Sequence, residues 1–139
     1  MTAGPGGPGG PVVAVGAVAV QDGALLLVRR GRGPAAGEWS VPGGRVEAGE
    51  SLHVAVVREV LEETALEVVV DRYLGWVERI DAAAGSHFVI LDFAVTVLAG
   101  TPSAGDDAAE VAWVPFDELG DLRLVDGLYD FLHDVGVVE

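Results

Sequence analysis

The hydrophobic and polar positions of the chain form short apolar runs separated by glycine-rich breaks, a pattern typical of β-strands. The runs 12–20 and 24–30 are separated by Gln-Asp-Gly, which is turn chemistry and predicts a hairpin. The longer run 66–80 predicts extended structure with a break near Asp71-Arg72 or Gly75. The other expected strands cover 39–41, 66–80, 87–98 and 110–115.

Helical periodicity is expected in two segments, with a further helical turn over 116–119. The first is Ser51–Thr64, in which Ser51 is a suitable N-cap. The second is an amphipathic helix over Leu124–Val135. Strands in hairpins mixed with two helices indicate an α+β domain with a mixed sheet. The residues expected to face the core are Val54, Val57 and Leu61 in the first helix and Leu124, Leu128, Phe131 and Leu132 in the second.

Length, cysteine content and charge limit the domain number, the chemistry and the partners that are expected. The 139 residues suit one domain, expected over 12–139 after a disordered Gly/Pro-rich lead-in at 1–11. The absence of cysteine excludes disulfides, Cys-type zinc sites and thiol nucleophiles. A net charge of -14 disfavours nucleic-acid and anionic-membrane partners. The run 12–20 is too short to span a bilayer, so we expect a cytoplasmic protein.

The first helix carries an acidic face. At 100° per residue, Glu59, Glu62 and Glu63 share an arc of about 100°. Each like-charge pair at this spacing opposes helix formation by roughly 0.2–0.5 kcal/mol. Arg58 is predicted to point away from this face and to leave the carboxylates without a counter-charge. A divalent cation would turn the repulsion into coordination, and oxygen ligands suit Mg²⁺ or Mn²⁺.

The spacing of these acids is more specific than their number. The segment fits G-x5-E-x7-R-E-U-x-E-E, where U is aliphatic, and a chance match has odds on the order of 10⁻⁶. It resembles the Nudix box, and the flanking WSVPGG at 39–44 resembles the loop that enters that box. The resemblance covers most of the chain, including the stretch 110–115. It implies an α/β/α sandwich around a mixed sheet and hydrolysis of a diphosphate linkage with Mg²⁺ or Mn²⁺. The matching positions are Gly44, Glu50, Arg58, Glu59, Val60, Glu62 and Glu63.

The resemblance also implies roles for these positions. The expected ligands of one to three divalent ions are the Gly44 carbonyl and the carboxylates of Glu59, Glu62 and Glu63. Glu59 and Glu63 are also the expected catalytic carboxylates. Arg58 and Glu50 are expected to form an ion pair that orients the ligands without touching substrate.

The general base stays open between two locations. Glu59 could act through a water, or the base could be a carboxylate from the loop after the box, where the candidates are Asp106, Asp107 and Glu110. An acidic surface loop explains these three residues equally well. One departure from the family pattern is Ala65, which stands where the box has glycine; in a left-handed C-cap alanine costs roughly 1 kcal/mol.

Substrate contacts are predicted at the end of the second strand. Arg29 and Arg30, with Arg32 beyond them, suit phosphate oxygens, although solvated strand ends explain them as well. Trp39 and Trp76 could stack on a base or pack in the core.

Three functions are consistent with these residues. The first is hydrolysis of a nucleoside diphosphate derivative, with ADP-ribose or a nucleotide sugar as the leading substrate. The second is sanitising hydrolysis of oxidised or non-standard nucleoside triphosphates to monophosphate and pyrophosphate. The third is a nucleotide sensor without catalysis, which retention of all three helix glutamates disfavours. The expected partner is a small phosphorylated nucleotide, RNA decapping is disfavoured by the charge, and the resemblance makes a homodimer a fair expectation.

Overall fold

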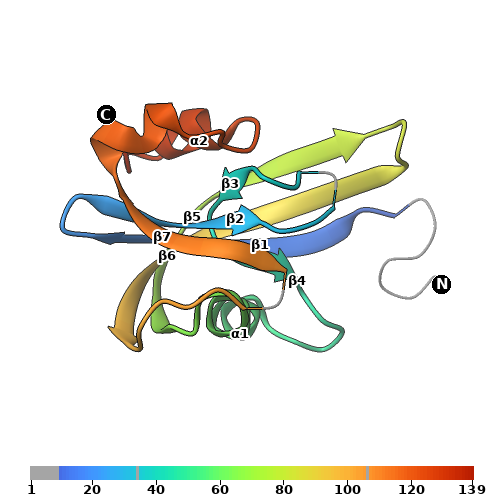
Figure 1. The fold of residues 1–139 in the computed structure, drawn as a ribbon. Coiled ribbons are helices and arrows are strands. Elements are labelled where there is room, and N and C mark those ends of the chain that lie inside the picture. The colour runs from blue at the N-terminus through green and yellow to red at the C-terminus, as the bar shows by residue number, and fades with distance from the viewer. Residues whose placement is uncertain (1–9, 34, 106) are drawn as a thin grey trace.

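A computed structural model describes residues 10–33, 35–105 and 107–139, which form a mixed seven-stranded sheet between two helical layers (Figure 1). Residues 1–9 of the expected lead-in lie outside the described residues. The elements, in chain order, are β1 (Val12–Gln21), β2 (Ala24–Arg30), β3 (Trp39–Ser40), β4 (Gly43–Arg45), α1 (Leu52–Thr64), β5 (Glu67–Asp81), β6 (Ser86–Ala99), β7 (Ala108–Pro115), the 3-10 helix η1 (Phe116–Asp121) and α2 (Leu128–Asp134).

Strand β1 is shared by several ladders of the sheet. The strand order is β3-β2-β1-β6-β5, with β4 also paired to β1 and β7 to β2. The β1–β6 pair is parallel and the other strand pairs are antiparallel, as expected for a mixed sheet. The first half of β1 pairs with β4 and its end pairs with β2, so the two partners diverge along one strand.

A helical layer covers each face of the sheet. Helix α1 packs on one face through Val56 and Val60, against Val15 of β1 and Phe93 of β6. Helices η1 and α2 pack on the other face and bury Leu119, Leu128 and Leu132. Figure 1 shows the two layers on opposite sides of the strands. The architecture is therefore the α/β/α sandwich that the sequence predicts.

Local signals predicted the strands closely except for β4, whose residues were not expected to be extended. The first turn uses Asp22 and Gly23, both with positive φ (53° and 75°), and joins β1 to β2 as a hairpin. The long strand β5 is irregular between Val70 and Arg72 and between Tyr73 and Gly75, where the sequence predicts a break. An extra residue in one strand bends it without ending the ladder, so β5 continues to Asp81.

The prediction for the C-terminal helix is wrong in its starting point. Helix α2 begins at Leu128, because Gly127 adopts a left-handed conformation with φ 81° and separates the helix from the preceding segment. Leu124 instead lies in extended backbone that forms a parallel bridge with Trp39. The four residues expected to face inward still pack against the core.

No helix within the described ranges is long and apolar enough to cross a membrane.

Candidate active site

The loop over residues 46–51 joins β4 to α1, and short polar contacts fix its course. The Ser51 hydroxyl accepts a hydrogen bond from the Val54 N–H (3.3 Å), so Ser51 is the N-cap that the sequence predicts. The Glu50 carboxylate accepts one from the Glu47 N–H (3.0 Å). The loop therefore enters the helix in a fixed orientation.

The structure contains the ion pair expected between Arg58 and Glu50. The Arg58 guanidinium donates two hydrogen bonds to the two carboxylate oxygens (2.6 and 2.9 Å) and a third to the Arg45 carbonyl (3.0 Å). The hydrogen bonds from Arg58 lower the pKa of Glu50 to about 2, and the same pairing raises the pKa of Arg58 above its ordinary value. This bidentate contact ties the loop and the end of β4 to α1.

The expectation that Arg58 leaves the acidic face without a counter-charge is wrong. One guanidinium nitrogen lies 3.1 Å from a carboxylate oxygen of Glu59 and 3.0 Å from one of Glu62. A long side chain reaches well beyond the direction of its own Cα–Cβ bond, which a helical wheel does not represent. In this state Arg58 supplies part of the positive charge that the acids require.

The predicted core face of α1 is wrong for two of its three residues, because Val57 packs against the core but Val54 and Leu61 do not. Val54 and Leu61 are 57% and 49% exposed, whereas Ala55, Val56 and Val60 are buried against the sheet. Apolar residues lie on two sides of the helix. The side with Ala55, Val56 and Val60, which has the smaller side chains, packs against the strands. As a result Glu59 and Glu63 lie at the border of the buried face, while Glu62 is exposed.

Two of the predicted glutamates lie against the double glycine of β4. The Glu63 carboxylate accepts a hydrogen bond from the Gly43 N–H (2.7 Å). The Glu59 carboxylate occupies the space that a side chain at Gly44 would need. Only glycine allows this approach, so the structure brings Glu59, Glu63 and Gly44 together at the edge of the sheet.

Burial perturbs both of these acids. Loss of solvation raises the pKa of Glu63 to about 7; Gly43 and Arg30 act against the rise, whereas Glu59 and Asp107 add to it. Loss of solvation also raises the pKa of Glu59, against the lowering effect of Arg58. Strongly perturbed carboxyls that lie side by side are typical of active sites.

The predicted phosphate-binding arginines and the predicted loop acids are partners of one another. Arg29 pairs with Glu110 (2.9 Å) and Arg32 pairs with Asp107 (2.6 Å), across the β2–β7 ladder and the loop before it. Arg30 is exposed and near enough to Glu63 to affect its pKa. The third candidate base, Asp106, lies outside the described residues.

The two candidate stacking residues differ in exposure. Trp39 is partly buried and packs against the core on the α2 side of the sheet. Trp76 is 60% exposed on β5, so it is not a core residue.

Ala65 takes the conformation that the missing glycine would favour. It caps α1 with φ 65° and ψ 13°, and its N–H donates to the Leu61 carbonyl (3.0 Å). The helix therefore ends where the family pattern predicts, with alanine in the left-handed region.

Two groups near the site were not among the predicted residues. The Gly43 N–H, which binds Glu63, follows from the Pro-Gly-Gly sequence only once the helix is placed beside it. Asp92 is buried on β6 and has a perturbed pKa. A single acid within the apolar run 87–98 is the sequence signal for it.

The donors present are suited to a hard divalent cation. Glu59, Glu63 and the Gly44 backbone supply oxygen atoms of the kind that Mg²⁺ and Mn²⁺ prefer. Across the described ranges, no three Asp, Glu or His side chains are grouped closely enough to hold one ion. Arg58 engages Glu59 and Glu62 instead, so ligation by all three glutamates requires their release from this contact.

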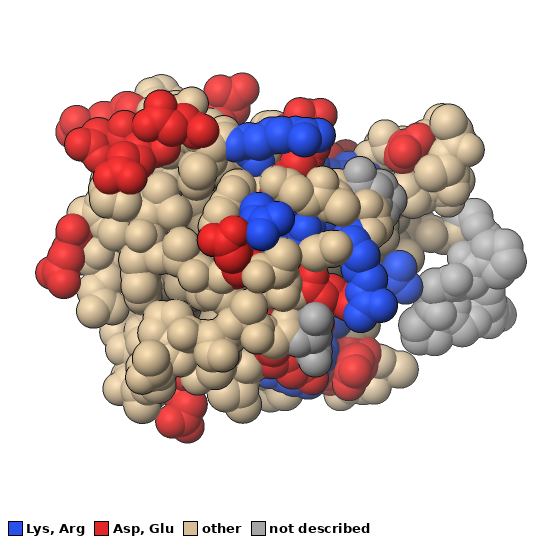
Figure 2. Space-filling model, in the orientation of Figure 1, with Lys and Arg blue, Asp and Glu red and all other residues tan. Residues whose placement is uncertain are grey.

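Charge is distributed unevenly over the surface. Figure 2 shows arginine atoms in a band across the centre and right of the view, and acidic atoms gathered at upper left over α2 and the turn before it. Acidic atoms also lie among the arginine atoms in this view, and Arg29, Arg32 and Arg123 are each paired with an acid.

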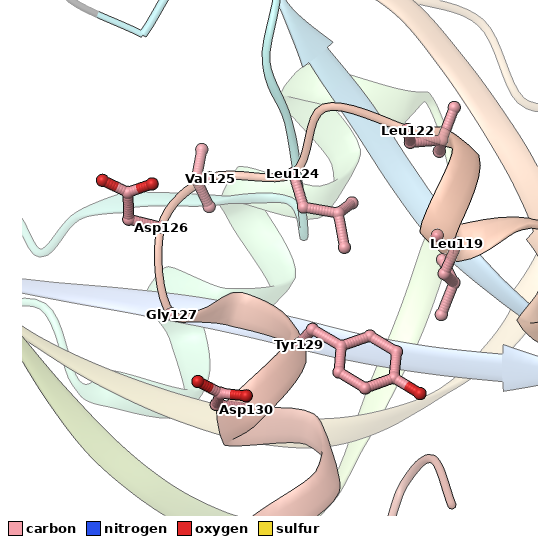
Figure 3. Close-up of a pocket in the computed structure, with 9 residues that line it drawn as sticks. Leu119, Leu122, Leu124, Val125, Asp126, Gly127, Tyr129 and Asp130 are labelled. Carbon is pink, nitrogen blue, oxygen red and sulfur yellow. The ribbon is translucent and has the colours of Figure 1, made fainter.

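A separate open hollow of about 330 Å³ lies between η1 and α2 (Figure 3). Leu119, Leu122 and Leu124 line it with Tyr129, and the carboxylates of Asp126 and Asp130 lie on the side away from Leu119. Its lining, as far as the described residues show, includes none of the predicted site residues.

The candidate site thus lies in a mixed sheet between helices, where a double glycine meets an acidic helix. A family model described as NUDIX domain matches residues 10–135, and the chain belongs to this family as a Nudix hydrolase.

Relatives of known name support this assignment. An ADP-ribose pyrophosphatase of Methanocaldococcus jannaschii is 38% identical over 107 residues, which is 77% of this chain and 63% of that protein. The chain thus spans somewhat less than two thirds of that relative. A Mycobacterium tuberculosis protein with the provisional name 8-oxo-dGTP diphosphatase 2 is 38% identical over 115 residues, 82% of this chain and 79% of that protein.

The fold is also similar to that of a solved structure from the same family. A MutT Nudix hydrolase from Burkholderia pseudomallei superposes with a TM-score of 0.80 at 33% identity, covering 89% of this chain and 97% of that one.

Proposed function

We propose that this Nudix hydrolase cleaves the diphosphate linkage of a nucleoside diphosphate derivative, with ADP-ribose or a nucleotide sugar as the first candidate. The observation that carries the proposal is the placement of Glu59 and Glu63 against Gly44 and Gly43, beside Arg30. The likeness to an ADP-ribose pyrophosphatase supports the substrate class.

Glu59, Glu62, Glu63 and the Gly44 carbonyl would hold one or more Mg²⁺ or Mn²⁺ ions. When bound, such an ion neutralises charge on the phosphates and lowers the pKa of a water. Arg58 and Glu50 keep the helix and loop in register, and ligation by Glu59 and Glu62 would follow their release from Arg58. Arg30, which acts electrostatically on Glu63, would contact a phosphate oxygen through its guanidinium.

The proton acceptor is proposed among Glu59, Asp107 and Glu110. Asp107 is the loop carboxylate with an electrostatic effect on Glu63, and Arg32 holds it in place. Glu110 is held by Arg29. Comparison of Asp107→Asn with Glu110→Gln under single-turnover conditions separates the two, because loss of the base lowers the rate most at low pH.

A second function is supported by the relative provisionally named 8-oxo-dGTP diphosphatase 2. In it the same glutamates would act on oxidised nucleoside triphosphates and release the monophosphate and pyrophosphate. A third alternative is a nucleotide sensor without turnover, which would bind the same ligands through the same surface.

The test is product analysis by liquid chromatography and mass spectrometry. The protein is incubated with Mg²⁺ or Mn²⁺ and ADP-ribose, nucleotide sugars, dinucleoside polyphosphates, or normal and oxidised nucleoside triphosphates. We expect AMP and ribose 5-phosphate from ADP-ribose, and a loss of at least about 10³ in kcat for Glu59→Gln. The matched control is Glu118→Gln, an exposed glutamate of η1 that should retain the wild-type rate.

Monophosphate and pyrophosphate from an oxidised triphosphate, with ADP-ribose intact, would replace the first function by the second. Ligand binding without turnover of any compound would favour the sensor. Full activity of Glu59→Gln would overturn the assignment of the catalytic carboxylates.

A further inference from the structure

Asp92 is a buried acid that the proposed catalytic arrangement does not use. It is 5% exposed in the middle of β6. In the described part of the chain no side-chain oxygen or nitrogen is both fully buried and without a partner, so the Asp92 carboxylate keeps a small contact with the surface. Burial raises its pKa to about 7, and only Arg79 acts appreciably in the other direction. Desolvating an acid is costly, so its presence in an apolar strand suggests a function beyond packing.

The chain makes room for this side chain. Asp92 is paired across the sheet with Gly16 of β1 and Gly75 of β5. A side chain at Gly16 would collide with the carboxylate, and Val41 lies beside the same spot. A side chain at Gly75 would meet Phe131 of α2 at 3.3 Å. Asp92 therefore projects from the α2 side of the sheet, over a floor of bare backbone.

The row of cross-strand partners that contains Asp92 and Gly16 extends to β4, beside the proposed catalytic glutamates. Gly16 pairs with Gly43 of β4, whose N–H binds Glu63. Two strand spacings separate β6 from β4, which places Asp92 roughly 10 Å from the Gly43 backbone. A ribose bridges this kind of span between the phosphates and the base of a nucleotide.

The neighbours of Asp92 on β6 suit a planar aromatic ring. Phe88 and Ile90 share its face by strand alternation and are partly exposed. Arg45 lies over the Phe88 ring at 5.5 Å, and Arg79 is the cross-strand partner of Phe88. Aromatic and guanidinium planes are the groups that stack on bases.

We propose that Asp92 binds the nucleobase of the substrate and determines base preference. The carboxyl offers an acceptor and, when protonated, a donor, so it can form paired hydrogen bonds with a base edge that presents both. The inference rests on the proposed function for the direction of the nucleotide, with phosphates at Glu59 and Glu63 and the base at Asp92.

Binding measurements test this without turnover. Isothermal titration calorimetry compares AMP, GMP, CMP and UMP with ribose 5-phosphate, which has no base, on wild type, Asp92→Leu and Asp92→Asn. We expect Asp92→Leu to weaken binding of at least one nucleoside monophosphate by about 10- to 100-fold while ribose 5-phosphate binds as before. Asp92→Asn should largely restore binding, because an amide also supplies a donor and an acceptor.

Two comparisons exclude a merely structural effect. Thermal unfolding checks that both variants fold, and Asp117→Asn, an exposed acid of η1, is the matched control. For any substrate that wild type turns over, Asp92→Leu should raise KM and change the ratio of kcat/KM between bases, with kcat nearly unchanged.

Equal binding of every monophosphate by wild type and Asp92→Leu, or equal weakening of monophosphates and ribose 5-phosphate, would overturn the inference. Its failure is distinguishable from failure of the proposed function. If binding depends on Asp92 but no compound is turned over, the inference stands and the proposed hydrolase function fails. If substrate is turned over and Asp92→Leu leaves KM unchanged, the proposed function stands and the inference fails.

Discussion

The acids at the two ends of α1 have pKa values that are shifted in opposite directions. At the N-terminal end Glu50 is held by two hydrogen bonds from Arg58, and its pKa falls to about 2. At the C-terminal end Glu63 receives one backbone hydrogen bond, and its pKa rises to about 7. The first arrangement stabilises the fold, whereas the second keeps a carboxylate available at a cost in stability. Acids of the same type, thirteen positions apart in the sequence, thus serve structure and chemistry separately.

The largest expected effect concerns Glu63, at the C-terminal end of α1. Glu63→Gln should reduce kcat by about 10³ or more, because it removes a charged oxygen donor for the divalent cation. Its stability should not fall, since the amide oxygen still accepts from Gly43 and a desolvated charge is removed. Steady-state kinetics with Mg²⁺ and urea unfolding measure the two effects. Parallel losses of activity and stability would show that Glu63 is a structural residue.

A smaller effect on activity and a larger one on stability are expected at the N-terminal end. Glu50→Gln removes the charge that Arg58 pairs with, so the melting temperature should fall by several degrees and kcat by about 10- to 100-fold. Glu47→Gln is the matched control, because its carboxylate is exposed and lies 3.9 Å from Arg58.

The pH dependence of Glu50→Gln sharpens this result. Glu50 takes up its proton near pH 4.5 when unfolded and near pH 2 when folded, so its stabilising effect is present above about pH 4.5 and is lost as the pH falls towards 2. The stability difference between wild type and Glu50→Gln should therefore shrink over this window in urea titrations. A constant difference from pH 7 to pH 3 would contradict the pairing.

The smallest expected effect concerns the residue just after the C-terminal end. Ala65→Gly should stabilise the protein by about 1 kcal/mol, because Ala65 holds φ 65°, a conformation that costs alanine more than glycine. Chemical denaturation measures the change, and kcat should stay the same. Ala84→Gly, in an exposed turn, is a suitable control for the general effect of glycine on the unfolded chain. Destabilisation by Ala65→Gly would mean that the unfolded-state entropy outweighs the relief of strain.

Local sequence was sufficient for the elements and for the composition of the acidic helix. The Ser51 cap, the Asp22-Gly23 turn and the irregular points of β5 all depend on residues close in sequence. The extent of α2 was not predicted, because the left-handed Gly127 interrupts a continuous apolar periodicity.

What the sequence could not supply was the direction from which α1 meets the sheet. Apolar residues occupy two arcs of the helix, and only packing against the strands decides that Val56 is buried and Val54 exposed. The burial of Glu59 and Glu63, the reach of Arg58 and the position of Asp92 beside Gly16 all depend on contacts between segments far apart in the chain. These contacts carry the candidate chemistry.

The sharing of β1 among ladders has a consequence for how the protein folds. The loop and helix that carry the acids are local, but the ladders that hold them join Val15 to Leu91 and Leu25 to Val114. Closing chain loops of this length is slow, and parallel pairing is slower than a hairpin. During synthesis the acidic helix therefore emerges from the ribosome after β1 and β4 but before β5, β6 and β7. The site becomes competent only when the last third of the chain has docked.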